Sequence, residues 1–292
     1  MQKEFILGIG SQRAGSTFLA RLLDQHPKIA IHPLKELHYF DTLFNIRKEQ
    51  TLKDFSKAQL TREIDRLCDA DSYQFIDPRW RWYLRSNFRL LTTSVSEIDY
   101  FSLFKDHENL VNKNIQYIGE STPEYMLLND NEVANIKDVV GDARVFLMCR
   151  NPKKRIISSF RLMIEYNQQQ KTVEELDTFL GSLIESKNIW IQNQINYNSY
   201  RTVYERYSKY FDSVTLIAYD DVIDDPGLIL KKISDRLGLV FNTPKMINFF
   251  DQKVNSLKVH YSPSRDVEEK LDTLLGSLCA ESNELLGRVL KR

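Results

Sequence analysis

The segment FILGIGSQRAGSTFLARLL, residues 5–23, limits the fold more than any other part of the sequence. A short apolar run leads into a glycine-containing loop, and the loop leads into a segment with helical spacing. This order predicts a buried strand followed by a helix whose N-terminus and loop amides face an anion. Gly10, Gly15 and Thr17 have the spacing of a phosphate-binding P-loop, but Ser16 stands where that motif has lysine.

Short apolar runs alternate with longer helical patterns along the rest of the chain. We expect strands at Phe5–Ile9, Ile29–His32, Tyr117–Ile118, Val145–Cys149 and Val214–Tyr219. We expect helices at Thr17–Gln25, about Leu52–Ala70, about Lys153–Tyr166, Ile189–Tyr210 and Leu228–Leu237. This alternation predicts an α/β fold, a parallel sheet flanked by helices and similar to P-loop nucleotide-binding proteins.

No linker rich in glycine, serine or proline divides the 292 residues. We therefore expect residues 1–292 to form a single domain. The stretch from about residue 42 to residue 114 is mostly helical in pattern and interrupts the alternation of strands and helices. It is interpreted as an insertion packed on the sheet.

Charge and cysteine content exclude several classes of function. The 40 basic and 40 acidic residues balance, so no overall field favours nucleic acid or an anionic membrane. Three widely spaced cysteines favour free thiols in a reducing compartment and indicate no structural metal. No apolar run is long enough for a signal peptide or a membrane span, and a cytoplasmic protein is expected.

Three further segments follow predicted strands. They are HPLKELHYFD (residues 32–41), GESTPEY (119–125) and CRNPKKRIISSF (149–160). Open α/β sheets bind ligands at the carboxyl ends of their strands, so these segments and the glycine loop are expected to share one site.

With these motifs the sequence resembles sulfotransferases that use 3′-phosphoadenosine 5′-phosphosulfate (PAPS), over nearly the whole chain. The resemblance implies that Arg150 and Ser158 bind the 3′-phosphate of the donor. KELHYFD is similar to the K-E-x-H-F-F-D of heparan sulfate sulfotransferases, in which the glutamate, here Glu36, is the catalytic base. The loop that would bind the 5′-phosphosulfate comprises Arg13, Ala14, Gly15, Ser16 and Thr17.

The resemblance also implies the ligands. PAPS would be the donor, adenosine 3′,5′-bisphosphate (PAP) the product, and no metal would be needed. The acceptor would carry a hydroxyl group, as a glycan does. Arg13 and Lys35 would stabilise charge on the leaving phosphate, and His38 would orient Glu36 with Asp41 as its partner or contact the acceptor. For each of these side chains a purely structural role, such as an ordinary ion pair, is the alternative interpretation.

Three features leave alternatives open. Ser121 occupies a position at which heparan-type relatives often have lysine, which argues against a heparan-like acceptor. The segment NSLKVHYSPSR is either a loop that closes over the nucleotide, with Lys258 on a phosphate, or an ordinary basic loop. The aromatic and basic segment from Asp77 to Arg89 is either an acceptor surface or an amphipathic helix whose aromatic stripe faces the core.

Two other functions are compatible with the loop alone. An ATP-dependent kinase would need a loop lysine and acidic Mg²⁺ ligands, for which Asp220 and Asp221 are the candidates. A non-catalytic nucleotide- or glycan-binding protein on the same fold is the second alternative.

Overall fold

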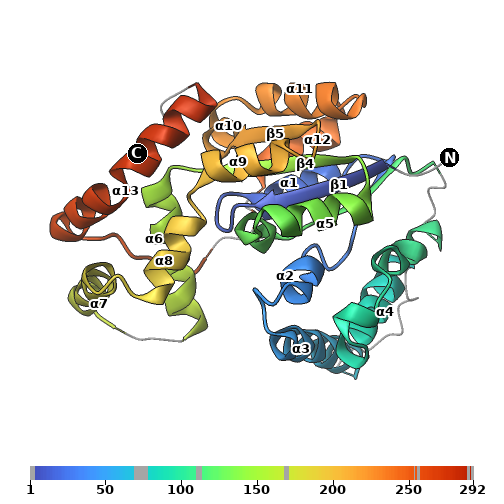
Figure 1. The fold of residues 1–292 in the computed structure, drawn as a ribbon, viewed down its shortest axis with the longest axis horizontal. Coiled ribbons are helices and arrows are strands. Elements are labelled where there is room, and N and C mark those ends of the chain that lie inside the picture. The colour runs from blue at the N-terminus through green and yellow to red at the C-terminus, as the bar shows by residue number, and fades with distance from the viewer. Residues whose placement is uncertain are drawn as a thin grey trace.

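The computed structural model describes residues 4–68, 78–109, 114–167, 171–252, 254, 257–287 and 290. Five parallel strands form one sheet in the order β2-β3-β1-β4-β5, with β1 at the centre (Figure 1). The predicted α/β fold is thus confirmed. The strands are β1 (Glu4–Gly10), β2 (Ile29–Ile31), β3 (Tyr117–Ser121), β4 (Ala143–Cys149) and β5 (Val214–Ala218).

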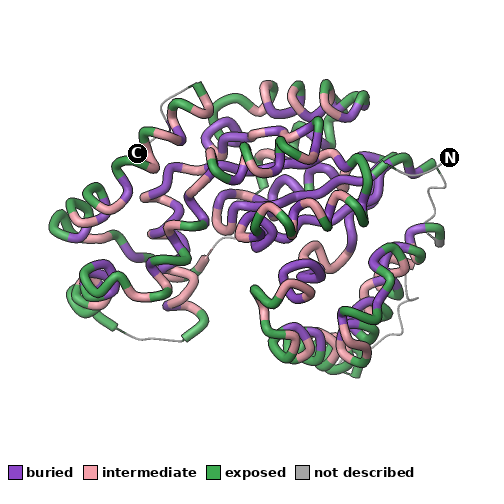
Figure 2. The backbone as a smooth tube through the Cα atoms, in the orientation of Figure 1, coloured by how far each residue is buried: buried purple, intermediate pink, exposed green. Residues whose placement is uncertain are grey.

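The sheet is covered by helices on both faces, and Figure 2 shows its strands as the buried centre of the molecule. Alternate residues of β1 enter two different hydrophobic clusters, because successive side chains of a strand point to opposite faces. Phe5 and Leu7 join one cluster and Ile6 joins the other. Burial on both faces explains why these strands are nearly continuous apolar runs in the sequence.

Different helices cover the two faces. The face that carries Ile6 packs against α1 (Ser16–Leu23), α11 (Pro226–Leu237) and α12 (Pro244–Asn248). The face that carries Phe5 packs against α5 (Asp130–Val140) and α9 (Tyr200–Ser208). The short helix α10 (Tyr219–Asp224) directly follows β5, so Tyr219 begins a helix and does not end the strand as expected.

All regular elements that the structure describes between β2 and β3 are helices. They are α2 (Tyr39–Leu43), α3 (Glu49–Cys68), α4 (Pro78–Thr92) and the 3₁₀ helices η1 (Val95–Glu97) and η2 (Tyr100–Asn109). Trp82 of α4 is fully buried and shares a cluster with Phe5 of the central strand. Trp82 thus faces the core, whereas Phe88 of the same helix is 61% exposed and Asp77 lies outside the described residues.

A third cluster joins α6 (Pro152–Tyr166), α7 (Val173–Glu185), α8 (Ile189–Asn196) and α13 (Arg265–Leu286). The single helix expected over residues 189–210 is wrong, because the chain breaks between α8 and α9. At the break, the Asn198 side chain accepts a hydrogen bond from Arg155 Nε at 2.6 Å and donates one to the Pro152 carbonyl at 3.5 Å.

The strand β3 is longer than expected, since Gly119, Glu120 and Ser121 continue it. Glu120 is buried and accepts hydrogen bonds from the hydroxyls of Tyr100 and Tyr125 at 2.8 and 2.7 Å. These hydrogen bonds offset the free-energy cost of burying the Glu120 carboxyl group in the core. In the described part of the chain, no helix combines the length and apolar character needed to cross a membrane.

Candidate active site

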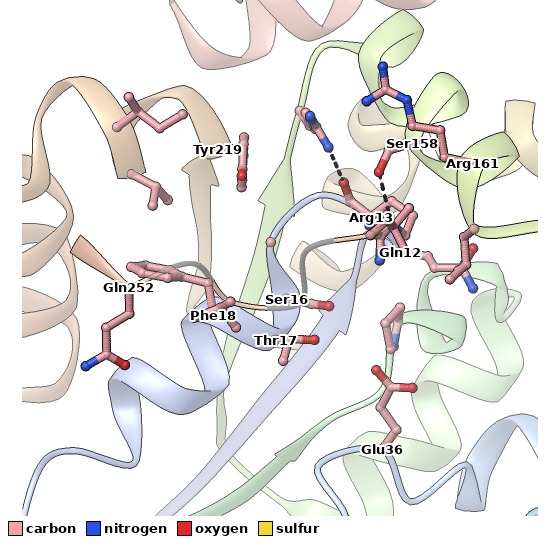
Figure 3. Close-up of a pocket in the computed structure, with 18 of the residues that line it drawn as sticks. Gln12, Arg13, Ser16, Thr17, Phe18, Glu36, Ser158, Arg161, Tyr219 and Gln252 are labelled. Carbon is pink, nitrogen blue, oxygen red and sulfur yellow. Dashed lines mark hydrogen bonds between the residues drawn. The ribbon is translucent and has the colours of Figure 1, made fainter. Parts of the chain in front are cut away.

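The carboxyl ends of the five strands meet at one edge of the sheet, because all the strands run parallel. A cavity of about 980 Å³ lies there, lined by residues that follow each of β1, β2, β3, β4 and β5 (Figure 3). The glycine loop, the KELHYFD segment, the GESTPEY segment and the segment after β4 therefore converge on one site, as their positions after strands predict.

The glycine loop ends at Gly15, which precedes the first residue of α1 and has a φ of 98°. A side chain here would be strained, and its Cβ would lie 2.7 Å from the Tyr219 ring. The first N–H groups of α1 have no partner within the helix, and Gly15, Ser16 and Thr17 line the cavity. Ala14 does not line it, because its side chain is buried in the core and its N–H donates to the Ser11 carbonyl.

Two arginines and a serine meet at the end of the cavity beside this loop. Arg13 Nε donates to Ser158 Oγ at 3.0 Å, and Arg150 Nη1 donates to the Arg13 carbonyl at 3.0 Å. The Arg150 guanidinium lies 4.7 Å from the centre of the Tyr219 ring. Burial and the charge of Arg150 lower the pKa of Arg13 below its usual value. Two guanidinium groups this close, partly desolvated, favour an anionic ligand between them.

Arg155 supports the glycine loop from inside the protein by donating a hydrogen bond to its backbone. The Arg155 side chain is fully buried. It donates to the Gln12 carbonyl at 3.2 Å and to the Gln194 carbonyl at 2.9 Å, and burial lowers its pKa to about 10. A cation without a carboxylate partner is tolerated there because backbone and amide oxygens surround it. Arg155 is therefore a structural support of the loop, not a group on the cavity surface.

Lys35 and Glu36 connect the loop after β2 with the glycine loop. Lys35 Nζ donates to Ser16 Oγ at 3.2 Å and forms an ion pair with Glu36. Burial raises the pKa of Glu36, but the Lys35 charge and the His38 hydrogen bond outweigh it and lower the pKa to about 2. Glu36 is thus ionised at neutral pH and lines the cavity on the side away from Ser158 (Figure 3).

His38 lies among three carboxylates. Its Nε2 is 3.6 Å from Glu36, and its Nδ1 is 3.0 Å from Asp41 and 3.7 Å from Glu124. Burial alone lowers the pKa of His38, but the hydrogen bonds to Asp41 and Glu36 outweigh it and raise the pKa to about 10. The ring is therefore protonated at neutral pH and ties Glu36 to Asp41.

Left-handed backbone conformations gather in these segments. The non-glycine residues with positive φ in the described part of the chain are Arg13, Lys35, His38, Asn45 and Lys187. Three of the five, Arg13, Lys35 and His38, are predicted site residues. Such conformations cost on the order of 1–3 kcal/mol each and persist where the surrounding structure fixes them, which is common at active sites.

Sequence reasoning missed many of the side chains that line the cavity, and four of them make polar or ring contacts at the site. Arg47 donates hydrogen bonds to Asp41 at 3.1 Å and to Glu124 at 3.4 Å. Arg47 and Glu124 therefore belong to the network of charged side chains around His38. Arg161 donates from Nε to the Tyr261 carbonyl at 2.8 Å. Glu124 lies within a quoted motif, Arg161 lies just beyond one, and Tyr219 is the last residue of an expected strand, so each had a signal in the sequence. Arg47 had none. The four residues are Arg47, Glu124, Arg161 and Tyr219.

The structure does not bring Lys258 or Ser121 to the cavity surface. Lys258 is exposed, although Leu257, Val259 and His260 around it do line the cavity. Ser121 is buried inside the sheet beside Gly8, where an added Cβ would lie 2.3 Å from its Oγ. The residues of α4 that the structure describes do not line the cavity either.

One group of described residues has the geometry of a cation site. Potential ligand atoms of Glu36, His38 and Glu124 all lie within 4.8 Å of one another. A histidine binds metal through an unprotonated nitrogen, whereas the raised pKa of His38 favours the protonated ring. Lys35 and Arg47 also pair with two of the carboxylates. The expectation that no metal is needed stays a prediction.

Comparison with known proteins places this site in context. Residues 5–243 match the model of a sulfotransferase family. The chain is 23% identical over 164 residues to a membrane-associated sulfotransferase, kil1, of Dictyostelium discoideum. That match includes 56% of this chain and 24% of the relative, so the chain spans about a quarter of that protein's length.

Two solved structures have a similar fold. A sulfotransferase from Alicyclobacillus acidocaldarius aligns with a TM-score of 0.61 and 19% identity, over 99% of this chain and 98% of that one. A sulfotransferase domain from the curacin biosynthetic pathway aligns with a TM-score of 0.51 and 14% identity, over 99% of both chains. At these identities the likeness concerns the fold alone.

The kinase alternative loses its support at the same time. Asp220 and Asp221, its candidate Mg²⁺ ligands, are buried and do not line the cavity. The family match, in contrast, begins in β1 and ends just before α12, so it includes every strand and every residue of the two phosphate motifs. The chain therefore belongs to the sulfotransferase family and is an enzyme of that family.

Proposed function

We propose that this sulfotransferase moves a sulfuryl group from PAPS to a hydroxyl group of its acceptor, with Glu36 as the general base. The observation that carries the proposal is the arrangement of one cavity. Arg13, Arg150 and Ser158 line it at one end, and Glu36 lines it at the other. A nucleotide held at the first end would present its sulfuryl group toward the second.

The donor would be held mainly by the loop and by the two arginines. Ser16, Thr17 and the free N–H groups of the first turn of α1 suit the 5′-phosphosulfate, because a helix N-terminus favours anions. Arg150 and Ser158 suit the 3′-phosphate, and Arg13 lies between the two groups. The Arg150 Nε has no hydrogen-bond partner among the described residues, which supports a ligand at this guanidinium.

The transfer step requires the removal of one proton. The acceptor oxygen forms a bond to sulfur as the bond from sulfur to the phosphate oxygen breaks, and the phosphate leaves with the electron pair. Glu36 accepts the hydroxyl proton during this step. Such general-base assistance contributes roughly 10²–10⁴-fold to a rate.

Lys35 links donor binding to the basicity of Glu36. In the free enzyme the lysine pairs with Glu36, which keeps the pKa of that carboxylate low and makes it a weak base. Because Lys35 also contacts Ser16 of the loop, an arriving phosphosulfate would compete for its charge. The pKa of Glu36 would then rise, and Lys35 would stabilise the leaving phosphate.

Asp41 and His38 orient the base. The hydrogen bond from His38 Nδ1 to Asp41 fixes the ring, and the opposite nitrogen faces Glu36. The similarity of KELHYFD to heparan sulfate sulfotransferases supports a carbohydrate hydroxyl as the acceptor. We further propose that residues 1–292 form one domain with residues 42–114 as its insertion, since a single cluster joins Trp82 to the central strand.

The proposal is tested with the nucleotide and the transfer reaction. PAP should raise the melting temperature of the protein without added metal and in the presence of a chelator, because a ligand that binds only the native state stabilises it. Radiolabelled PAPS should then label a hydroxyl acceptor. Equal stabilisation by ATP, or a requirement for Mg²⁺, contradicts the proposed donor.

A further inference from the structure

The end of the cavity at Glu36 has a distinct chemistry, and we refer to it as the acceptor end. It comprises cavity-lining residues that follow β2 and β3 together with one residue of α3: Glu36, His38, Arg47, Phe55, Pro123 and Glu124.

Among the described residues, every cationic group at the acceptor end or directly beside it has a carboxylate partner. Lys35 pairs with Glu36, and protonated His38 lies within 3.7 Å of three carboxylates. Arg47 lies 3.1 Å from Asp41 and 3.4 Å from Glu124. The three positive charges are balanced by three negative ones, so no unpaired cation remains there for a sulfated or carboxylated acceptor.

Glu124 adds a barrier to anionic acceptors. Its side chain is 12% exposed and lines the cavity, and its buried Oε2 lies 3.7 Å from His38 Nδ1 without a hydrogen bond. A hydroxyl group of an acceptor can donate a hydrogen bond to the exposed part of this carboxylate. Glu124 repels a carboxylate or sulfate, because like charges in a partly desolvated cavity interact strongly.

Ser121 cannot supply the missing positive charge. It is buried beside Gly8 inside the sheet and does not line the cavity. The position at which heparan-type relatives often have a lysine is therefore filled by a small neutral side chain directed into the protein interior.

Apolar side chains, in contrast, stay exposed around the cavity. Phe55 of α3 is 42% exposed and Ile223 of α10 is 71% exposed, and both line it. Tyr166, at the end of α6, is 80% exposed and also lines the cavity, on the side of Arg13. Exposed apolar groups at a binding cavity gain free energy when an apolar ligand covers them.

From this charge balance and these apolar groups we infer that the acceptor is an uncharged hydroxyl compound with an apolar portion, and that Glu124 excludes anionic acceptors. The inference rests on the proposed function and narrows its acceptor class. Acidic glycans are excluded by it, whereas neutral glycosides with an apolar aglycone are included.

The test compares three glycosides that differ in one feature each. Octyl β-D-glucopyranoside carries hydroxyls and an apolar chain, octyl β-D-glucuronide has a carboxylate in place of the primary hydroxymethyl group, and methyl β-D-glucopyranoside lacks the chain. With radiolabelled PAPS and glycosides below their micelle concentrations, we expect kcat/KM for the octyl glucoside to exceed both others at least about tenfold.

Two variants test which residue is responsible for each substrate preference. Glu124→Gln should lower the preference for glucoside over glucuronide about tenfold, because it removes the repelling charge. Phe55→Ala should lower the preference for the octyl over the methyl glucoside about fivefold while leaving the charge preference unchanged. Phe88→Ala is the control, since Phe88 is 61% exposed on α4 and does not line the cavity. It should change neither ratio.

The outcomes separate the inference from the proposed function. Equal or better transfer to the glucuronide, no transfer to the octyl glucoside by an enzyme that still binds PAP, or an unchanged charge preference in Glu124→Gln overturns the inference. Failure of the unaltered enzyme to bind PAP overturns the proposed function itself. The PAP-induced rise in melting temperature, measured on each variant, verifies that it is folded.

Discussion

Arg13 Nε donates a hydrogen bond to Ser158 Oγ over 3.0 Å, although the two residues are 145 positions apart in the sequence. The bond joins the loop after β1 to α6. Arg150 reaches the same loop through the Arg13 carbonyl. The two motifs that resemble separate phosphate sites thus form one continuous surface, close enough together to serve a single nucleotide with phosphates at its 3′ and 5′ positions.

The first prediction concerns the 3′-phosphate. Arg150→Ala should weaken PAP about 10- to 150-fold relative to adenosine 5′-phosphate, because a charge-assisted contact of roughly 1.5–3 kcal/mol is lost only with the former ligand. Calorimetric titration of both ligands measures the difference. Arg144→Ala is the matched control, since Arg144 lies on β4, the strand that Arg150 follows, and pairs with Glu4 away from the cavity. Equal weakening of both ligands would assign Arg150 to the loop fold and not to the 3′-phosphate.

A second prediction concerns the support of the glycine loop. Arg155→Ala should lower the free energy of unfolding by about 3 kcal/mol, because several buried oxygen atoms lose their donor. These include the Gln12 and Gln194 carbonyls and the Asn198 side chain. Urea denaturation of this variant and of Lys154→Ala, a partly exposed neighbour, provides the comparison. A loss of PAP affinity without a loss of stability would place Arg155 in the binding surface instead.

The strands were predictable because a strand buried on both faces leaves a local signal. Val145–Cys149 and Phe5–Ile9 are nearly continuous apolar runs, and both are strands. The polar end of β3 was not predictable in the same way. Glu120 is stable inside the sheet only because Tyr100 and Tyr125 donate to it. Tyr125 follows the strand in the GESTPEY segment, but Tyr100 comes from a part of the chain that no local pattern connects to the strand.

The site residues that lie within short sequence motifs were predictable from the sequence. The motifs gave the positions of Arg13, Glu36 and Arg150, and all three line the cavity. The burial of Arg155 and the break at Asn198 depend on each other across 43 residues, so neither has a local signal. The same holds for the charge network, in which Arg47 and Glu124 gain their importance only from contacts made in the fold.

A third prediction follows from the protonation of His38. The raised pKa of about 10 means that its stabilising contribution is fully present below the unfolded-state pKa near 6.5 and is lost as pH rises toward 10. The melting temperature of the unaltered protein should therefore fall more steeply between pH 7 and pH 9.5 than that of His38→Gln. The difference between the two curves removes the effect of other titrating groups. Parallel curves would mean that His38 is neutral in the folded protein.

The final prediction concerns Glu36. Glu36→Gln keeps the size and polarity of the side chain but cannot accept a proton at neutral pH. Turnover should fall by roughly 10²–10⁴, the range expected for loss of a general base. PAP affinity should stay within a few-fold, because Arg13, the loop amides and Arg150 carry donor binding.

The same variant separates a catalytic role for Glu36 from a structural one. A structural Glu36 would lower the melting temperature while leaving turnover per folded molecule intact. Measuring PAP affinity, melting temperature and rate on one preparation distinguishes the two cases. Near-normal turnover in a fully folded Glu36→Gln would refute the proposed base. His38 would be a poor replacement, because its pKa of about 10 leaves the ring protonated and without a free nitrogen to accept a proton. The remaining carboxylate on the cavity surface near His38, Glu124, would then be the group to test.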